Sequence, residues 1–476
     1  MVESLDKLIC SYPCSLQNAV ETINNSGLGI CFIITHKREL IGVLSDGDVR
    51  RALLKGHELF EPVDVAINKN FVSCDINSSD SAIGNAVSKI SNYVPLIDEN
   101  NLLVDFASPR RRRGIPVLEP RFSGNELEYL TDCVKSGWIS SQGQYIGRFE
   151  KEFEKYFTGT HALSVSNGTT ALHLALAALG IKEGDEVILP TLTFAASANA
   201  VIYCGATPVF CDVDESMNMD LEKLKTLVSS RTKAILIVHL YGRCTNMRKL
   251  SKFCKDQNLL LVEDCAESFG TSWDRKLVGT YGDAATFSFF GNKTITTGEG
   301  GMVLFKQSDI AQFAKTLRDH GMSKTKRYWH EHVGFNYRMT NMQAAVGLAQ
   351  IERSAEILQQ KRAVFEAYRE AFENCSYFTY VANERPSEHC SNWLFVVVLN
   401  TDFIRDNVMD ALRLCGIDSR PVFYPLHTMP PYLKYKRSNC ELAENMSQQG
   451  ICLPSSATLT KDDLDYICVK LLGILS

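Results

Sequence analysis

The spacing of apolar residues predicts a repeated unit near the N-terminus. Over residues 16–23 and again over 83–90, apolar side chains recur at the i, i+3, i+4, i+7 spacing of an amphipathic helix. The positions are Leu16, Ala19, Val20 and Ile23, then Ile83, Ala86, Val87 and Ile90. Each helix precedes two short apolar runs that predict a β-hairpin, 31–35 with 40–44 and 93–97 with 102–106. We therefore predict one small α+β domain over residues 1–107, made of two helix–hairpin copies.

A different pattern begins near Gly168. Short apolar runs recur near Val187, Val209, Ile235 and Leu259, with helical patterns between most neighbours. Strands that alternate with helices predict an α/β fold, in which a mostly parallel sheet is covered by helices on both faces. Ligands of such sheets bind beyond the carboxyl ends of the strands. We expect functional residues directly after strands.

The remaining segments set the domain boundaries. We predict a linker at 108–114, a large domain at 115–350 and a smaller α+β subdomain at 351–476. One long helix is predicted from about Asn341 to Asn374. The linker contains four arginines, 110–113, which could hold a phosphate, although a solvated linker is the simpler interpretation.

Composition narrows the classes of function. Of 476 residues, 45% are hydrophobic and 22% are charged, and the net charge of -5 argues against binding of nucleic acid or anionic membrane. No apolar run reaches the roughly 18 residues that span a bilayer, and residues 1–6 are acidic, unlike a secretory signal. The 16 cysteines are scattered without a CxxC pair. We expect a cytoplasmic protein with reduced cysteines that acts on a small molecule.

The segment between the two N-terminal copies is a candidate nucleotide site. Residues 42–51, GVLSDGDVRR, predict a strand, a polar turn and a helix start, where backbone amides and carboxylates come together. This segment and the duplication resemble a pair of CBS motifs, a module that often senses nucleotides. The resemblance implies that Asp48 binds ribose hydroxyls and that Ser45 helps to hold phosphate. The second copy lacks the Ser-Asp-Gly-Asp element, and a scaffold that binds nothing is an equal alternative.

Two segments of the large domain could hold an anion and a cation. In SNGTTALHL, Gly168 and Thr169 open a helix whose free amides could bind a phosphate, or the threonine could be a plain helix cap. In LLLVEDCAE, an apolar strand delivers Asp264 and Glu267 at its carboxyl end. Asp264 could stabilise a protonated ring nitrogen by a charge-assisted hydrogen bond, or it could cap a helix.

A lysine between a strand and a glycine-rich turn carries the most chemical information. The segment is SFFGNKTITTGEGG, in which Lys293 follows Ser288. A partly desolvated lysine has a lowered pKa, which makes its free amine available for imine formation. A lysine in a polar loop can equally be solvated. His330 and His332 lie further along, but no other Cys, His or acid stands at ligand spacing, so we predict no metal site.

Together these segments resemble the sugar-nucleotide aminotransferases of the DegT/DnrJ/EryC1/StrS family, which are pyridoxal 5′-phosphate (PLP) enzymes of fold type I. The similarity covers nearly all of 115–476. The stretches SFFGNKTITTGEGG, DHGMSKTKRYWH, NYRMTNMQAAVGLAQ and RPVFYPLHTMPPY are most similar to members that aminate GDP-4-keto-6-deoxymannose.

The resemblance implies a role for each candidate residue. Lys293 would bond to the cofactor and carry the proton, Asp264 would pair with the ring nitrogen, and Glu267 would lie near the phenolic oxygen, where many relatives have Gln or His. Gly168, Thr169 and Ser288 would hold the phosphate. Phe194 would stack on the ring, and Asn336 would reach the phosphate from a neighbouring subunit, which implies a homodimer with shared active sites.

The implied reaction moves an amino group from glutamate to a nucleotide-linked 4-keto-6-deoxy sugar. The family's sugar dehydratase branch has histidine in place of the lysine, so Lys293 favours amination over deoxygenation. Two alternatives stay open: another ketosugar, such as a 3-keto nucleotide sugar or an eight-carbon sugar acid, or an inactive regulator that senses nucleotides.

Overall fold

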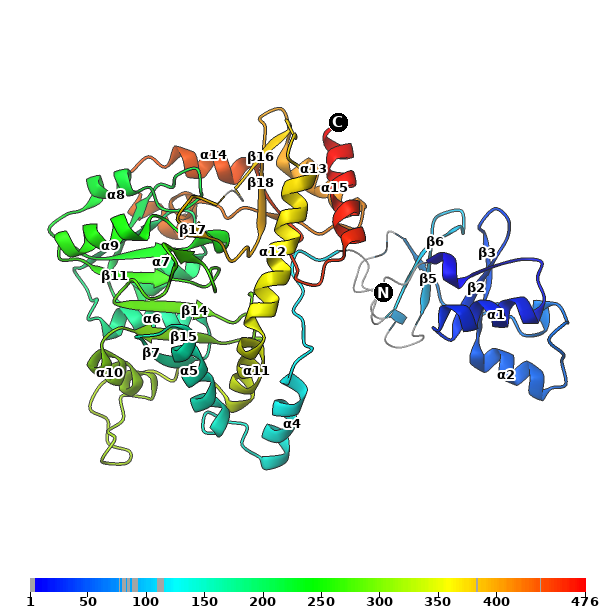
Figure 1. The fold of residues 1–476 in the computed structure, drawn as a ribbon, viewed down its shortest axis with the longest axis horizontal. Coiled ribbons are helices and arrows are strands. Elements are labelled where there is room, and N and C mark those ends of the chain that lie inside the picture. Colours follow the sequence, from blue (N-terminus) through cyan, green and yellow to red (C-terminus); the bar gives the residue numbers. More distant parts are fainter. Residues whose placement is uncertain are drawn as a thin grey trace. The chain divides into compact units, whose positions relative to one another are not determined.

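The computed structural model describes residues 5–76, 78, 83, 86–87, 93–108, 115–381, 384–436 and 438–476. The chain divides into two units, unit 1 (Met1–Gly114) and unit 2 (Ile115–Ser476) (Figure 1). Ile90 of the second predicted helix and the arginines 110–113 lie outside the described residues. Within the described ranges, no helix is long and apolar enough to cross a membrane.

Unit 1 contains one sheet arrangement twice. The first sheet has the order β1–β2–β3 and the second the order β4–β5–β6, and each combines a parallel with an antiparallel pair. The elements are η1 (Leu5–Leu8), β1 (Ile9–Ser11), α1 (Leu16–Ser26), β2 (Ile30–Ile34), β3 (Leu40–Ser45), α2 (Asp46–Leu54), η2 (Val63–Val65), β4 (Cys74–Asp75), β5 (Val94–Ile97) and β6 (Leu103–Ala107). Phe32 and Phe106 lie 5.9 Å apart between ring centroids, so the two copies share a core.

Unit 2 is built on a seven-stranded sheet of order β7–β15–β14–β11–β10–β8–β9. Only β15 runs antiparallel to its neighbours in this sheet, so the sheet is mostly parallel. Its strands are β7 (His161–Val165), β8 (Glu186–Pro190), β9 (Thr207–Cys211), β10 (Thr232–Val238), β11 (Leu260–Asp264), β14 (Ala284–Ser288) and β15 (Gly301–Phe305). The strands β8 to β11 lie where the apolar runs predict them.

Alternate residues of these strands pack into different cores, because successive side chains of a strand point to opposite faces. Ile235 belongs to a core with Phe149 and Phe153 of α5, whereas Leu236 belongs to a core with α6 and α7. The helices of this part are α4 (Glu126–Ser136), α5 (Gln144–Tyr156), α6 (Gly168–Ala178), α7 (Ala195–Tyr203), α8 (Leu221–Leu227), η3 (Leu240–Gly242), α9 (Met247–Asp256), α10 (Ser308–Arg318) and α11 (Asn341–Glu352). Helices therefore cover both faces of the sheet (Figure 1).

The C-terminal part carries a four-stranded sheet of order β16–β18–β20–β19. Helix α12 (Ser354–Ala371) runs from α11 to this sheet (Figure 1). The remaining elements are β12 (Ser272–Trp273), β13 (Lys276–Leu277), β16 (Phe378–Tyr380), β17 (Glu388–His389), β18 (Phe395–Leu399), α13 (Arg405–Leu414), β19 (Arg420–Pro421), η4 (Leu426–Thr428), η5 (Pro430–Tyr435), α14 (Glu441–Gln449), β20 (Gly450–Leu453) and α15 (Lys461–Leu475).

The prediction of one long helix over 341–374 is wrong, because the chain breaks at Arg353 into α11 and α12. Arg353 has φ -110° and ψ 6°, outside the helical region. Its guanidinium bonds to Glu356 at 2.9 Å, and Glu126 of α4 lies 3.9 Å away. Apolar spacing continues through the break, so the sequence pattern does not reveal it.

A buried ion pair joins β17 to the chain after β10. Glu388 accepts hydrogen bonds from Arg243 Nη2 at 2.7 Å and from the Cys244 amide at 2.9 Å, and Arg385 Nε lies 3.0 Å away. Burial alone would raise the pKa of Glu388, but the hydrogen bonds and charges of the two arginines outweigh it and lower the pKa to about 2. The carboxylate therefore stabilises the fold only in its charged form.

We expect Glu388→Gln to lower the free energy of unfolding at pH 7 by about 3–5 kcal/mol, because the buried guanidinium of Arg243 loses its countercharge. In the wild type this contribution is present above pH 4.5, the usual pKa of the group, and is lost as the pH falls towards 2. Urea denaturation at several pH values measures both effects. Glu222→Gln, at an exposed ion pair with Lys225, is the control and should change little. A pH-independent difference between Glu388→Gln and wild type would contradict this account.

Candidate active site

A cavity of about 660 Å³ lies beyond the carboxyl ends of the strands of the large sheet. Its lining residues follow β7, β8, β10, β11 and β14, at the edge where ligands of α/β sheets bind. Seven residues singled out in the sequence line it: Gly168, Thr169, Phe194, Asp264, Glu267, Ser288 and Lys293. Asn336 does not line it; this residue is exposed and pairs through its backbone with Asp319.

The N-terminus of α6 forms one end of the cavity. Asn167 caps the helix, and its side chain accepts a hydrogen bond from the Thr170 amide at 2.9 Å. Gly168 lies so close to β14 that a Cβ atom there would stand 2.8 Å from Ser288 Cβ. Absence of a side chain at 168 thus brings the helix terminus against the Ser288 hydroxyl. Helix amides and a hydroxyl facing one space suit an anion.

Asp264 ends β11 and is 5% exposed. Its carboxylate accepts hydrogen bonds from Ser197 Oγ at 2.9 Å and from the Ala266 amide at 3.1 Å. Burial raises the pKa of Asp264, and these two hydrogen bonds partly oppose the rise. Within the described part of the chain, no basic side chain forms an ion pair with Asp264. A cationic group in the cavity would therefore stabilise its charged form.

Lys293 and Glu267 are in contact and both line the cavity. The ammonium Nζ of Lys293 lies 3.4 Å from Glu267 Oε1, and Glu267 Oε2 accepts a hydrogen bond from the Tyr241 amide at 3.1 Å. Burial raises the pKa of Glu267, whereas the nearby charge of Lys293 lowers it. Only 14% of the Lys293 side chain is exposed. An amine is thus held inside the cavity beside a group that can give or take a proton.

Sequence reasoning missed the wall contributed by the C-terminal part. Trp393, Arg420 and Phe423 line the cavity, together with Tyr241 of the large domain. Tyr241 stacks on Phe423 with centroids 5.8 Å apart. Arg420 and Phe423 lie in the stretch RPVFYPLHTMPPY, whose resemblance to the family could have indicated them. Trp393 lies in a short irregular segment without such a motif.

In unit 1, the two candidate nucleotide ligands bond to each other. Ser45 Oγ donates to Asp48 Oδ2 at 2.6 Å, and the two residues form a capping box at the start of α2. Arg51 Nη2 lies 2.5 Å from Asp48 Oδ1. Burial raises the pKa of Asp48, but hydrogen bonds from Ser45 and Arg51 outweigh it and lower the pKa. These contacts account for both residues without a ligand, so the nucleotide site stays a prediction.

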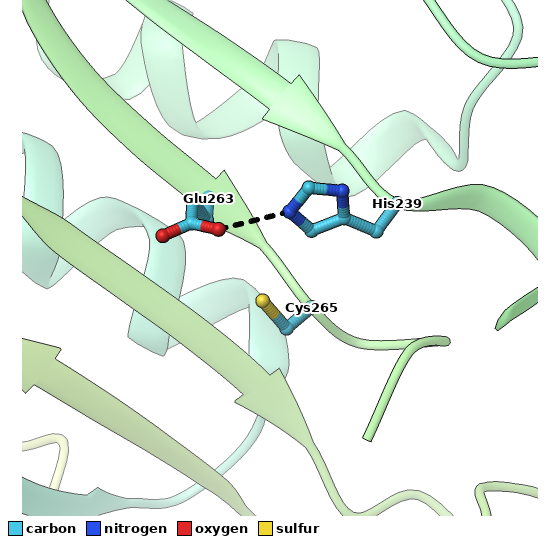
Figure 2. A group of neighbouring side chains, drawn as sticks. All are labelled: His239, Glu263 and Cys265. Atoms are coloured by element: carbon cyan, nitrogen blue, oxygen red, sulfur yellow. Dashed lines mark hydrogen bonds and ion pairs between the residues drawn. The ribbon is translucent and has the colours of Figure 1, made fainter. Parts of the chain in front are cut away.

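Three buried side chains that could bind a metal, His239, Glu263 and Cys265, meet between β10 and β11 (Figure 2). Glu263 Oε2 lies 3.1 Å from His239 Nε2. The Glu263 oxygens also accept hydrogen bonds from three backbone amides, those of Gly279, Tyr281 and Gly282. Burial holds the pKa of the Cys265 thiol well above its usual value, which disfavours a thiolate ligand. We interpret the cluster as a brace between strands. The other two candidates, His330 and His332, are exposed.

Comparison with known proteins identifies the family of unit 2. Residues 120–472 match the DegT/DnrJ/EryC1/StrS aminotransferase family. A GDP-perosamine synthase of Vibrio cholerae is 46% identical over 358 residues, covering 74% of this chain and 97% of that protein. A GDP-perosamine synthase of Caulobacter vibrioides is 45% identical over 370 residues, covering 76% of this chain and 98% of that protein. The family match does not include unit 1.

Solved structures agree with this assignment. Helicobacter pylori PseC, an aminotransferase involved in the biosynthesis of pseudoaminic acid, superposes with a TM-score of 0.74 at 26% identity, covering 76% of this chain and 99% of its own. The Escherichia coli GDP-4-keto-6-deoxy-D-mannose-3-dehydratase with bound hydrated PLP superposes with a TM-score of 0.71 at 26% identity, covering 75% of this chain and 99% of its own. The chain belongs to the DegT/DnrJ/EryC1/StrS aminotransferase family and uses PLP.

Proposed function

We propose that this protein transfers the amino group of glutamate to a nucleotide-linked 4-keto-6-deoxy sugar, with GDP-4-keto-6-deoxymannose as substrate and GDP-perosamine as product. Relatives named GDP-perosamine synthase, 44–46% identical and covered over 96–98% of their length, support the choice of sugar. The observation that carries the proposal is a largely buried lysine amine, Lys293, in one cavity with the buried carboxylate of Asp264. An amine in this place favours amination over deoxygenation.

The residues of the cavity fit PLP at both ends. The start of α6, which lies directly against Ser288 because Gly168 has no Cβ, suits the phosphate. Amides of Gly168 and Thr169, with the hydroxyls of Thr169 and Ser288, would hold it. At the other end, the buried carboxylate of Asp264 would pair with the protonated ring nitrogen. Ser197 would fix the orientation of that carboxylate by its 2.9 Å hydrogen bond.

When bound, PLP supplies an aldehyde that takes up the amino group and a ring that withdraws electrons. Phe194 would cover one face of the ring. Glu267 would lie near the phenolic oxygen, where many relatives have Gln or His; burial raises the pKa of Glu267, and the nearby charge of Lys293 opposes the rise. Lys293 would anchor the cofactor and then move the proton between C4′ of the cofactor and the substrate carbon.

We propose a homodimer in which Asn336 reaches the phosphate of the neighbouring subunit. Its position outside the cavity of its own subunit supports this arrangement. Large apolar side chains are also exposed on and near α4 and in the loop before Asn336: Phe122, Leu127, Trp138, Trp329 and Val333. A second subunit packed on this surface would shield these apolar side chains from water.

We propose that unit 1 is a CBS-like pair that binds a purine nucleotide or nucleotide sugar near Ser45 and Asp48. The repeated sheet order supports a duplicated module, and the capping box supports the scaffold alternative equally. We propose a cytoplasmic location for the enzyme. All 16 cysteines are free, as expected in a reducing compartment.

Gly168→Ala should weaken PLP binding at least tenfold, or by about 1.4 kcal/mol, because the new Cβ would displace either Ser288 or the start of α6. Titration of the cofactor-free protein with PLP, followed by absorbance, measures the affinity. The control is Gly147→Ala, at an exposed position of α5 where a Cβ meets nothing within 4 Å. Equal affinities of the two variants would argue against phosphate binding at this helix.

The substrate assay tests the proposed function. Purified protein should be yellow and should aminate GDP-4-keto-6-deoxymannose with glutamate, and Lys293→Ala should lose the colour and about 10³-fold or more of the rate. A 3-keto nucleotide sugar and an eight-carbon keto sugar, tested in parallel, should react more slowly. Faster turnover of either would replace the proposed substrate. A colourless wild type that aminates none of the three, even with added PLP, would indicate the inactive regulator.

Calorimetry on the full chain tests the nucleotide site of unit 1. We expect heat of binding with a purine nucleotide or a GDP-sugar in addition to the heat from the cavity of unit 2, and Asp48→Ala should lose this additional heat. Asp46→Ala, an exposed acid in the same helix turn, is the matched control. No heat beyond that of the unit 2 cavity, together with unchanged kinetics after deletion of residues 1–107, would leave only the scaffold alternative.

A further inference from the structure

The indole ring of Trp393 lies directly against the amine of Lys293. The Nζ atom stands 4.1 Å from the ring centroid, within the range of a cation–π contact. Trp393 is 3% exposed and lines the cavity. The electron-rich face of an indole favours the charged form of an amine. Lys293 is thus held between this face and Glu267, whose Oε1 lies 3.4 Å away.

The same side chain also holds the loop that carries Lys293. The indole Nε1 donates a hydrogen bond to the backbone carbonyl of Asn292 at 2.9 Å. The ring also stacks on Tyr241, with centroids 6.2 Å apart and an interplanar angle of 11°. One tryptophan therefore fixes both the amine and the backbone next to it.

The backbone of Trp393 is itself braced from two directions. Lys361, 2% exposed, donates from Nζ to the carbonyls of Trp393 at 3.0 Å and Ser455 at 2.8 Å. Burial lowers the pKa of Lys361 to about 7. From the large domain, Gly242 approaches so closely that a Cβ there would lie 2.7 Å from the Trp393 amide nitrogen. The ring therefore has little freedom to move away from Lys293.

We propose that Trp393 is a positioning residue for Lys293: its indole face seats the ε-ammonium whenever the amine is not bonded to the cofactor, and its N–H fixes the loop at Asn292. This inference rests on the proposed role of Lys293 as the cofactor lysine. Lys293 would have a free amine whenever the cofactor carried the amino group. A seat against the ring would keep the amine within reach of C4′ and would stabilise its charged form.

The contact can be measured in full-length protein freed of PLP and labelled with ¹³C at the lysine ε-carbon. The ε-methylene signal of Lys293, identified by its loss in Lys293→Arg, should be shifted upfield by the ring current of Trp393. Trp393→Met should remove the shift. Trp393→Phe keeps a ring and should retain part of the shift. Trp273→Phe, at another buried tryptophan, should retain it fully.

The holoenzyme provides the second readout. In single turnovers of the amine-loaded form with ketosugar, Trp393→Met should lower the maximal rate more than Trp393→Phe, which keeps an aromatic face for the amine. A purely structural role would lower the two rates alike, which would overturn the proposal. An unshifted Lys293 signal in the wild type would overturn it too. If that signal is shifted but Lys293→Ala binds PLP covalently and turns over normally, the proposed function fails instead.

Discussion

The site depends on two carboxylates that the fold keeps out of water at the carboxyl end of β11. Asp264 and Glu267 are each 5% exposed. Removing a charged carboxylate from water costs several kcal/mol even after relaxation, unless hydrogen bonds and opposite charges compensate. Ser197, the Ala266 amide and the Tyr241 amide supply hydrogen bonds, and Lys293 supplies charge. For Asp264 these interactions offset the cost of burial only in part, since its pKa stays raised. A protonated pyridine ring would provide the missing positive charge.

The parallel sheet determines where these groups meet. Strands β8, β10, β11 and β14 end at one edge, so residues far apart in sequence reach the same cavity. Glu263, one residue before Asp264, points to the opposite side of β11 and bonds to His239 and three backbone amides. This brace ties β11 to β10 and to the turn before β14. These contacts therefore fix the end of β11, and with it Asp264, from the opposite side of the strand.

Local patterns in the sequence predicted much of the fold and part of the site. Strand spacing located β8 to β11, and apolar repeats located α1, β2, β3, β5 and β6. Motifs at strand ends pointed to Asp264, Lys293 and the Gly168 turn, which the structure brings to one cavity, because their chemistry is visible in short segments. The helix break at Arg353 was missed, since the apolar spacing continues through it and no local pattern marks the break. Trp393 was missed for the same reason: its partner Lys293 is 100 residues away, and no local pattern marks the pair.

The most direct test of the account is the site of covalent attachment of the cofactor. Reduction of the PLP-loaded protein with borohydride fixes the cofactor to its lysine, and peptide mass spectrometry identifies that residue. We expect the pyridoxyl tag on Lys293 alone, and no tag on the buried Lys361. A tag on another lysine, or none on protein that binds PLP, would contradict the account.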